Sequence, residues 1–378
     1  MRKPAVFVLI LFALSAILPA VLSAQRKKGK GEKEEVTQTL EVPKDPPATI
    51  QADTSRIFFD VSPLTPKGLL SQQVRDALKA LQRTARRGAI VKLRAFVAGT
   101  GDMRRVQTIV SESFTERRLP LPVLSVVQVG ALPMEGAQVV IEATGVARKT
   151  ENPHGIAFIS GQMAASDEML LDVAPLARKS IASVADAVKA AGAQPVDILR
   201  ATCFLSSLQD VNAVRGIASA QFPQAEWNFV QILRAPARAV VECEAVARLR
   251  APAGAPLRLL NPPGLPQSPN YSQIALVGAP KLLLSGSRLA FRFQPDDARL
   301  AFQRLGRDLE QAGGSLRHVA MSSIYPLSDA VGDLVRKVRF EFYDKDNPPA
   351  STMLPFEGLP GLDASFAVEV VAVLPTSQ

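Results

Sequence analysis

Three stretches of the sequence share one pattern, and its spacing limits the possible folds more than any other feature. Each stretch is a β-like run with a glutamate as its fourth residue: Val139–Ala143, Val241–Ala245 and Phe366–Val370. A second β-like run begins 18, 17 and 18 residues before Glu142, Glu244 and Glu369, at Leu124, Trp227 and Ser351. A helical, a β-like and another helical pattern precede each pair. The sequence therefore predicts three copies of a unit of about 100 residues.

Hydrophobic periodicity predicts the elements within each unit. The first unit has predicted strands at Ile57–Val61 and Ile90–Ala98, and predicted helices at Ser71–Arg86 and Met103–Phe114. Its first helix carries an apolar face of Val74, Leu78 and Leu81. The second unit continues the order with Leu171–Ala191, Ile198–Leu205, Val211–Ala220, Phe229–Leu233 and Ala239–Ala247. This order predicts an α+β fold with both helices on one face of a mainly antiparallel sheet.

The other face of each sheet also needs cover. Val139–Val146 carries apolar residues on both faces of the predicted strand, whereas a strand of a half-exposed sheet is apolar mainly on one face. Three units packed around an axis bury such faces against one another, as the subunits of a homotrimer do. We therefore expect a single-chain pseudo-trimer, a monomer with internal three-fold pseudo-symmetry.

The first 48 residues differ from the rest. Arg2 and Lys3 precede the apolar run Ala5–Ala20, which is followed by small residues up to Ala24. This order is typical of a cleaved signal peptide, and an uncleaved membrane anchor is the alternative. The following residues are rich in Lys, Glu, Gly and Pro and predict a disordered tether. We expect a secreted or periplasmic protein without stable membrane insertion. The expected segments are a signal peptide at 1–24, a tether at 25–48, units at 49–149, 150–250 and 270–376, and a linker at 251–269.

The composition argues against nucleic-acid and metal chemistry. A formal charge of +9 and the many basic residues of the first unit are compatible with a surface that binds polyanions. The chain has three Tyr, one Trp and no RNA-stacking motif, and an exported protein meets little RNA, so no nucleic-acid partner is expected. His154 and His318 are the only histidines and no Cys/His cluster has ligand spacing. We expect neither a metal nor a cofactor.

Both cysteines of the chain, Cys203 and Cys243, lie in predicted strands of the second unit. In an exported protein they either form a disulfide or remain buried core thiols. Their spacing in the sequence does not give the distance between them, so both alternatives stay open.

Three motifs of the second unit are shared with a known family: Ile159–Gln162, Val196–Phe204 and Val241–Ala247. They resemble the RidA/YjgF reactive-intermediate deaminases, also called endoribonuclease L-PSP. The third unit is similar to this family at Tyr271–Gln273, and the first at Ile90–Val97. The resemblance implies a chorismate-mutase-like (RidA-like) domain in each unit and clefts between neighbouring domains.

The resemblance also implies an activity. Deaminases of this family hydrolyse imines or enamines of amino acids to 2-keto acids and ammonia, and an arginine in a Pro-Ala-Arg strand motif holds the substrate carboxylate with two hydrogen bonds. The matching positions here are Leu124, Trp227 and Ser351, and none is arginine. Losing a charge-assisted pair costs about 10- to 100-fold in affinity, which predicts degenerate active clefts.

Other candidate site residues follow from the same resemblance. Glu242 matches the glutamate that positions a water and is the candidate catalytic residue. Ser160 and Ser285 match a substrate-binding serine, and Tyr271 matches a tyrosine near the start of the domain. These three are candidate ligand-binding residues.

Two further candidates have open roles. Glu244 points to the same side of its strand as Glu242, so it either lines the cleft or bonds neighbouring amides. Trp227 either stacks on a ligand or fills the vacated pocket with apolar bulk. Arg234 and Arg238 follow on the adjoining turn, where they either reach the cleft or are solvated.

We therefore predict an exported RidA-like protein with degenerate clefts, which binds a small molecule or serves as a structural or interaction module. The alternative is a hydrolytic deaminase of reactive imine or enamine intermediates, with Glu242 positioning the water. Whether the protein is an enzyme is not decided by the sequence.

Overall fold

The computed structural model describes residues 44–84, 88–99 and 101–374. The predicted signal peptide and residues 25–43 of the predicted tether lie outside the described residues. Among the described helices, none combines the length and the apolar character that a membrane crossing requires.

The first unit is built on a four-stranded sheet with the order β2-β5-β3-β4. Strand β5 is antiparallel to β2 and β3, and β3 is parallel to β4. Helices α1 and α2 pack on one face, where Val74, Leu78 and Leu81 are buried as predicted. The bounds are β2 Ile57–Val61, α1 Leu70–Thr84, β3 Gly88–Ala98, α2 Arg104–Thr115, β4 Val123–Val129 and β5 Val139–Ala147.

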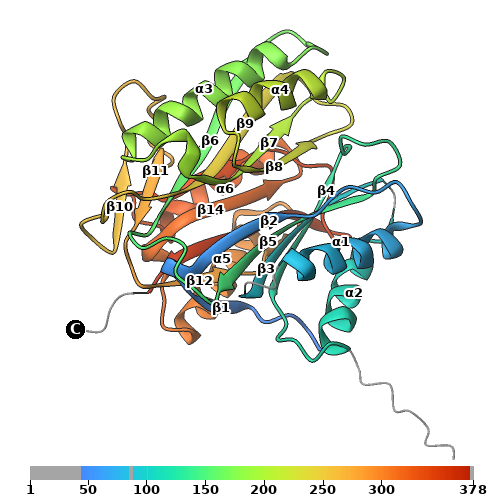
Figure 1. Cartoon of the computed structure of the whole chain (residues 1–378), viewed down its shortest axis with the longest axis horizontal. Helices are drawn as coiled ribbons and strands as arrows, with labels where there is room; N and C mark the ends of the chain where they lie inside the picture. Colours follow the sequence, from blue (N-terminus) through green and yellow to red (C-terminus); the bar gives the residue numbers. More distant parts are fainter. Residues whose placement is uncertain (1–43, 85–87, 100, 375–378) are drawn as a thin grey trace, which may run out of the picture. The chain divides into compact units, whose positions relative to one another are not determined.

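The second unit repeats this plan in a six-stranded sheet with the order β10-β11-β6-β9-β7-β8. Figure 1 shows α3 and α4 side by side over the strands β6, β9 and β7, and the apolar faces of both helices enter one core. The bounds are β6 Ile156–Ser166, α3 Ala174–Ala190, β7 Ile198–Leu205, α4 Val211–Gln221, β8 Glu226–Gln231, β9 Ala239–Arg248, β10 Leu257–Leu260 and β11 Ile274–Val277.

The third unit has the strand order β1-β12-β16-β14-β15, and β13 also pairs with β16. Helices α5 and α6 cover this sheet through a core that includes Phe302, Leu305 and Val335. The bounds are β1 Thr49–Asp53, β12 Lys281–Ser285, β13 Arg288–Phe291, α5 Pro295–Gln311, β14 Val319–Pro326, α6 Asp329–Val338, β15 Ala350–Met353 and β16 Ala364–Val373. Short 3₁₀ turns lie at Thr54–Arg56, Pro195–Asp197, Leu316–His318 and Arg339–Glu341. The chain thus has the predicted α+β fold in three units.

Neighbouring units exchange strands. The chain enters at β1, which pairs with β12 of the third sheet before β2 begins the first sheet. In the same way β11 pairs with β6 of the second sheet before β12 begins the third. Strand β10, which lies within the expected linker 251–269, continues the second sheet by pairing with β11. The exchange joins the units by backbone hydrogen bonds as well as by side-chain packing.

The second face of each sheet is buried against the other units. One apolar cluster contains Phe96, Phe204 and Tyr325, one residue from each unit. Phe204 and Tyr325 pack edge to face on Phe356, and Phe96 packs edge to face on Phe204. A separate apolar cluster joins residues of all three units around Phe59 and Phe158. Such shared cores agree with the expected internal pseudo-symmetry.

Candidate functional site at the junction of the second and third units

Strand ends of one unit meet the edge strand of the next at the junctions between units. Between the second and third units, the Ser351 N–H donates to Ser160 Oγ at 2.9 Å. Between the third and first units, the Ser287 N–H donates to the Leu124 carbonyl oxygen at 3.3 Å. Ser351 and Leu124 are two of the three positions at which the resemblance implies an arginine, so both lie at a junction between units.

Glu242 lies in the junction of the second and third units, and its carboxyl group is buried against the backbone of Gly161. A Cβ atom at position 161 would approach Glu242 Oε1 to 1.8 Å, so a side chain there would displace this carboxyl. Burial and the nearby Glu244 raise the pKa of Glu242 to about 8, although Arg336 and Arg238 oppose the shift. Glu242 is therefore mainly protonated at neutral pH, and a neutral carboxyl can donate a hydrogen bond.

Arginines of the third unit reach the same junction. Arg339 follows α6 and is only 2% exposed. Its Nη2 donates to the Asn270 carbonyl oxygen, while its Nε has no hydrogen-bond partner among the described residues. Burial lowers the pKa of Arg339 to about 10, which still leaves the guanidinium charged at neutral pH. A buried guanidinium without a carboxylate partner is costly unless another group supplies the acceptor.

Polar side chains around Ser160 complete the junction. Ser160 Oγ donates to the Ser272 carbonyl oxygen at 2.5 Å, and Gln162 Nε2 donates to Gln273 Oε1 at 2.7 Å. Tyr271 stands next to Ser272, and burial together with Glu242 raises the pKa of its hydroxyl. Besides Arg339 Nε, the buried atoms Gln162 Oε1 and Ser351 Oγ have no partner within the described part of the chain. The junction therefore presents hydrogen-bonding groups that the protein itself leaves unsatisfied.

Glu242→Gln is expected to stabilise the protein at neutral pH. In the folded state Glu242 keeps a proton that the unfolded chain releases above pH 4.5. The contribution of this proton to the free energy of unfolding is therefore fully present below pH 4.5 and is lost as the pH rises to about 8. Glutamine removes this loss, and we expect the free energy of unfolding at pH 7 to rise by about 3 kcal/mol. Urea unfolding at pH 4 and pH 7 measures both values. Equal gains at the two pH values, or a gain as large in the exposed control Glu116→Gln, would contradict this assignment.

The three glutamates of the repeat meet in the interior, in a cluster separate from this junction. Glu142 Oε2 accepts from Arg94 Nε at 2.8 Å, and Glu244 Oε1 accepts from Arg94 Nη2 at 2.6 Å. Glu369 Oε2 accepts from Lys92 Nζ at 2.8 Å. Glu244, for which the sequence left open a place in the cleft or a bond to neighbouring amides, has a cation as its direct partner in this central cluster.

Opposite charges balance in the central cluster. Arg200 Nη1 lies 3.2 Å from Glu142 Oε2, so three cations face three carboxylates. Burial opposes the ionisation of Glu142, but Arg200 and Arg94 outweigh it and hold the pKa of Glu142 at about 2. Lys92 and Arg94 likewise lower the pKa of Glu369 against the effect of burial. A cavity of about 40 Å³ borders the cluster, with room for ordered water.

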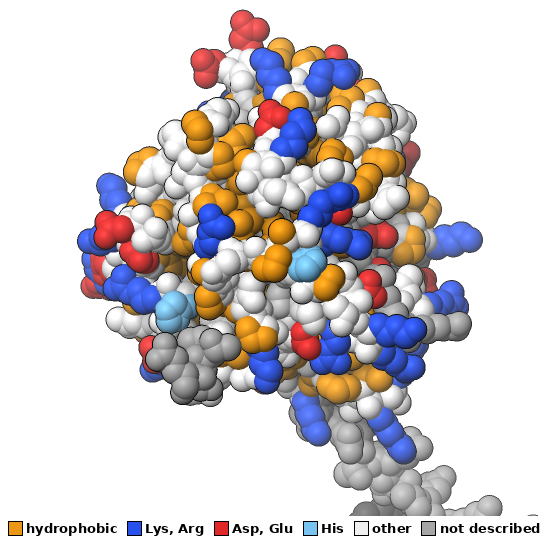
Figure 2. All heavy atoms as spheres, turned by 60° about the vertical axis from the view of Figure 1, so that its left-hand side comes forward, with side chains coloured by type: hydrophobic (Ala, Val, Ile, Leu, Met, Phe, Trp, Pro, Cys, Tyr) orange, Lys and Arg blue, Asp and Glu red, His pale blue; other side chains and the backbone are white. Residues whose placement is uncertain are grey.

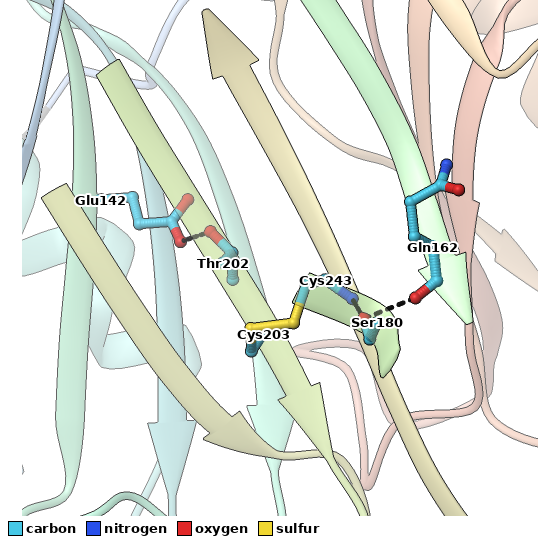
Figure 3. The surroundings of a disulfide bond; sticks show 6 residues. All are labelled: Glu142, Gln162, Ser180, Thr202, Cys203 and Cys243. Atoms are coloured by element: carbon cyan, nitrogen blue, oxygen red, sulfur yellow. Dashed lines mark hydrogen bonds between the residues drawn. A yellow bond between two sulfur atoms is a disulfide. The ribbon is translucent and has the colours of Figure 1, made fainter. Parts of the chain in front are cut away.

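A disulfide between Cys203 and Cys243 resolves the question left open by the sequence. Figure 3 shows it on neighbouring strands, β7 and β9, between the central cluster and the junction. On one side Thr202 Oγ1 donates to Glu142 Oε1 at 2.6 Å. On the other side the Cys243 N–H donates to Ser180 Oγ, which in turn donates to the Gln162 carbonyl oxygen. The disulfide therefore anchors the strand that carries Glu242 and Glu244.

Trp227 and Ser285 lie away from the junction of the second and third units. Trp227 stacks between Phe222 and Phe229, with ring centroids 5.8 and 5.4 Å away, and its Nε1–H donates to the Phe222 carbonyl oxygen. Ser285 Oγ accepts from the Val370 N–H at 2.8 Å. The structure thus brings together Ser160, Glu242 and Tyr271 of the predicted site residues, and places the other three elsewhere.

Metal ligands do not converge in the described chain. No group of three or more His, Cys, Asp or Glu side chains with metal-binding geometry occurs in residues 44–84, 88–99 and 101–374. Figure 2 shows the two histidine side chains well apart on one face of the molecule.

Sequence reasoning missed the two arginines of the third unit at this junction. Arg336 and Arg339 precede the strand at which an arginine was expected, and in a sequence they read as ordinary polar residues at the end of an amphipathic helix.

Comparison with known proteins agrees with the geometry of an α+β unit repeated in one chain. The family model described as Endoribonuclease L-PSP matches residues 53–147 and again 150–249, together more than half of the chain. The chain belongs to this family, which is the RidA/YjgF family that its motifs resemble. No curated protein matches the chain.

Solved structures of the same family are each similar to about a third of the chain. A conserved Rid family protein from Yersinia pestis is 16% identical, with 32% of this chain and 100% of that chain covered and a TM-score of 0.30. A YjgF family member from Neisseria meningitidis is 15% identical, with 32% and 97% covered and a TM-score of 0.24. A Mycobacterium tuberculosis member of the YjgF/YER057c/UK114 family is 20% identical, with 31% and 99% covered and a TM-score of 0.24.

Proposed function

We propose that this protein binds a small carboxylate-bearing molecule at the junction of the second and third units. The observation that carries the proposal is Arg339, a buried guanidinium whose Nε lacks a partner in the described chain. A ligand carboxylate supplies the acceptor, and Arg336 adds a second positive charge. Because Glu242 is protonated at neutral pH, it donates to the ligand instead of repelling it.

The other two clefts are proposed to be degenerate. Leu124 replaces a possible carboxylate-binding arginine at the junction of the third and first units, and its side chain offers no charge. Trp227 occupies the third such position and is engaged by two phenylalanines. Binding at one of three pseudo-equivalent junctions is therefore the expected stoichiometry.

Export of the protein is part of the proposal. Disulfides persist in oxidising compartments and are rare in the cytosol, so the Cys203–Cys243 bond supports the secreted or periplasmic location that the N-terminal sequence predicts. A light-scattering mass of one chain in solution is expected, because the internal units already bury one another. A stable trimer of chains would contradict the pseudo-trimer.

Arg339→Lys is expected to weaken binding of 2-oxobutanoate, the proposed probe, by about tenfold or more. Lysine keeps the charge but loses the planar fork that matches a carboxylate. Calorimetric titration of the full chain at pH 7 gives the affinity, and Arg336→Gln is expected to weaken it as well. Arg234→Gln, an exposed partner of Glu357, is the matched control and leaves binding unchanged. Unaltered affinity in both junction variants would refute the site.

The pH dependence of binding offers an independent check on Glu242. Its pKa of about 8 implies that the carboxyl ionises above that pH and then repels a bound carboxylate. Affinity for 2-oxobutanoate should therefore fall between pH 7 and pH 9 in the natural protein, and should stay nearly level in Glu242→Gln.

Imine hydrolysis is the second candidate function, and the state of Glu242 favours it. A glutamate with a pKa near 8 exchanges a proton at neutral pH, as a group that positions water and transfers protons must do. Release of ammonia from freshly generated amino-acid imines measures the activity. A rate comparable to that of an arginine-bearing relative, lost in Glu242→Ala, would establish an enzyme. No acceleration, together with intact carboxylate binding, would leave a binding protein or an interaction module.

A further inference from the structure

Residues 44–48 form a strap across the junction of the third and first units. On the first unit, Gln107 Nε2 of α2 donates to Asp45 Oδ1 at 2.9 Å, and Ser111 Oγ donates to the Lys44 carbonyl oxygen at 2.6 Å. Directly after the strap the chain continues as β1, which pairs with β12 of the third unit. The strap therefore begins on a helix of one unit and ends on a strand of another.

A pocket of about 350 Å³ lies beside the strap, and residues 45–48 form one of its walls. Leu124 and Val126 of β4 and Leu289 of β13 give the other walls apolar parts. Arg288, the basic residue in the lining, forms an ion pair with Asp308. Because position 124 is one at which the family resemblance implies an arginine, this pocket corresponds to the family's cleft at the junction of the third and first units.

The strap is attached more weakly than the strand that follows it. Strand β1 is held by five residue pairs with β12, and the Gly286 N–H extends this ladder by donating to the Ala48 carbonyl oxygen at 3.0 Å. Pro46 and Pro47 have no N–H, so the strap has no backbone donor at these positions. Among the hydrogen bonds between described residues, those from Gln107 and Ser111 hold it on α2.

These properties predict that the strap detaches as one stiff piece. Asp45 and Pro46 each precede a proline, which restricts their backbones to extended conformations, so the movement is concentrated at Ala48. Two side-chain hydrogen bonds favour the attached state by about ten- to a hundredfold. Segments with few buried contacts open locally while the rest of the protein stays folded, and Lys44, Asp45 and Pro47 are exposed.

We propose that the strap is a lid on the pocket at the junction of the third and first units. Attached to α2, it closes the pocket, and by swinging about Ala48 it opens the apolar walls to small uncharged molecules. The segment that precedes β1 thereby controls access to this junction. The lid does not depend on carboxylate binding at the junction of the second and third units.

A thiol placed in the pocket measures the opening of the lid. Ser287→Cys introduces it in the lining with almost no change in shape. It is the only free thiol of the chain, because Cys203 and Cys243 are bonded to each other. Alkylation of the full chain by iodoacetamide, a neutral reagent, is measured under native conditions and in denaturant. We expect the native rate to be about ten- to a hundredfold lower, in proportion to the fraction of open lid.

Substitutions of the exposed Gln107 are expected to move this rate in opposite directions. Gln107→Glu places a second carboxylate against Asp45, so repulsion opens the lid and alkylation becomes about five- to tenfold faster. Gln107→Lys forms an ion pair with Asp45 and slows alkylation by about twofold. Ser111→Ala removes the second attachment and should also speed the reaction.

Ser71→Cys is the matched control, because Ser71 is a partly exposed serine of α1 that lies outside the pocket. Its alkylation should be the same in the two Gln107 variants. The proposal is overturned if the thiol at position 287 reacts as fast in the native protein as in denaturant. It is also overturned if Gln107→Glu and Gln107→Lys give that thiol equal rates, or if the control thiol responds to them as strongly.

Discussion

Glu142→Gln is expected to lower the free energy of unfolding by about 4 kcal/mol, because it removes one partner from a buried network of charges. Glu142 accepts from Arg94, from Thr202 Oγ1 at 2.6 Å and from Asn228 Nδ2 at 2.8 Å, and it faces Arg200. Glutamine fits the space but carries no charge. Three cations, Lys92, Arg94 and Arg200, then face only two carboxylates, Glu244 and Glu369, and bulk water does not screen the excess positive charge.

The linkage to pH gives this prediction a second readout. The pKa of Glu142 is lowered from 4.5 to about 2, so the stability it contributes is present above pH 4.5 and is lost as the pH falls toward 2. Urea unfolding between pH 7 and pH 2 should show this loss in the natural protein and a smaller one in Glu142→Gln. Glu112→Gln removes the partner of Arg75 in a partly exposed pair and is expected to cost less than about 1 kcal/mol. Similar costs for the two variants would show that the central cluster is not a buried ion network.

Removal of the disulfide by Cys203→Ala together with Cys243→Ala is expected to cost about 4 kcal/mol. The bond joins residues 40 positions apart, and the entropy of the loop that it closes in the unfolded chain accounts for that amount in the chain-entropy model. Both sulfurs are fully buried, so alanine also leaves a small unfilled volume. Urea unfolding of the double variant measures the loss.

Reduction of the natural protein supplies the control for the disulfide. Unfolding in the presence of a thiol reductant should approach the stability of the double variant, because the reduced unfolded chain regains the same freedom. Stability that is unaffected by both the reductant and the substitutions would contradict the role of the bond. If stability falls but 2-oxobutanoate still binds to the folded fraction, the disulfide supports the fold rather than the geometry at Glu242.

Local patterns were sufficient for most regular elements. The predicted strands Ile57–Val61 and Ile198–Leu205 match β2 and β7 residue for residue, because both are short apolar runs bounded by turns. The helix predicted at Leu171–Ala191 begins later, at Ala174, where Pro175 fits the first turn and Asp172 Oδ1 accepts from the Ala174 N–H. Strands β1, β10, β11 and β13 escaped prediction, since strands of four or five residues depend on the partners beside them.

The candidate site was predictable only where the family motif survives. Ser160, Glu242 and Tyr271 come together at one junction, and each was named from its motif. Arg339 was not named, because nothing in its immediate sequence distinguishes a buried guanidinium from a solvated one. Its role became visible through burial and through the unpaired Nε.

By itself, the sequence determined the number of units, their α+β type and the recurrence of one glutamate in each, because periodicity and spacing are properties of neighbouring residues. The tertiary structure alone decided which strands are exchanged, that Glu244 joins Arg94 instead of the junction, and that Arg339 is buried with its Nη2 on the Asn270 carbonyl oxygen. These outcomes depend on contacts between residues far apart in the sequence, which form only when the three units close on one another. The local sequence pattern does not predict these long-range contacts.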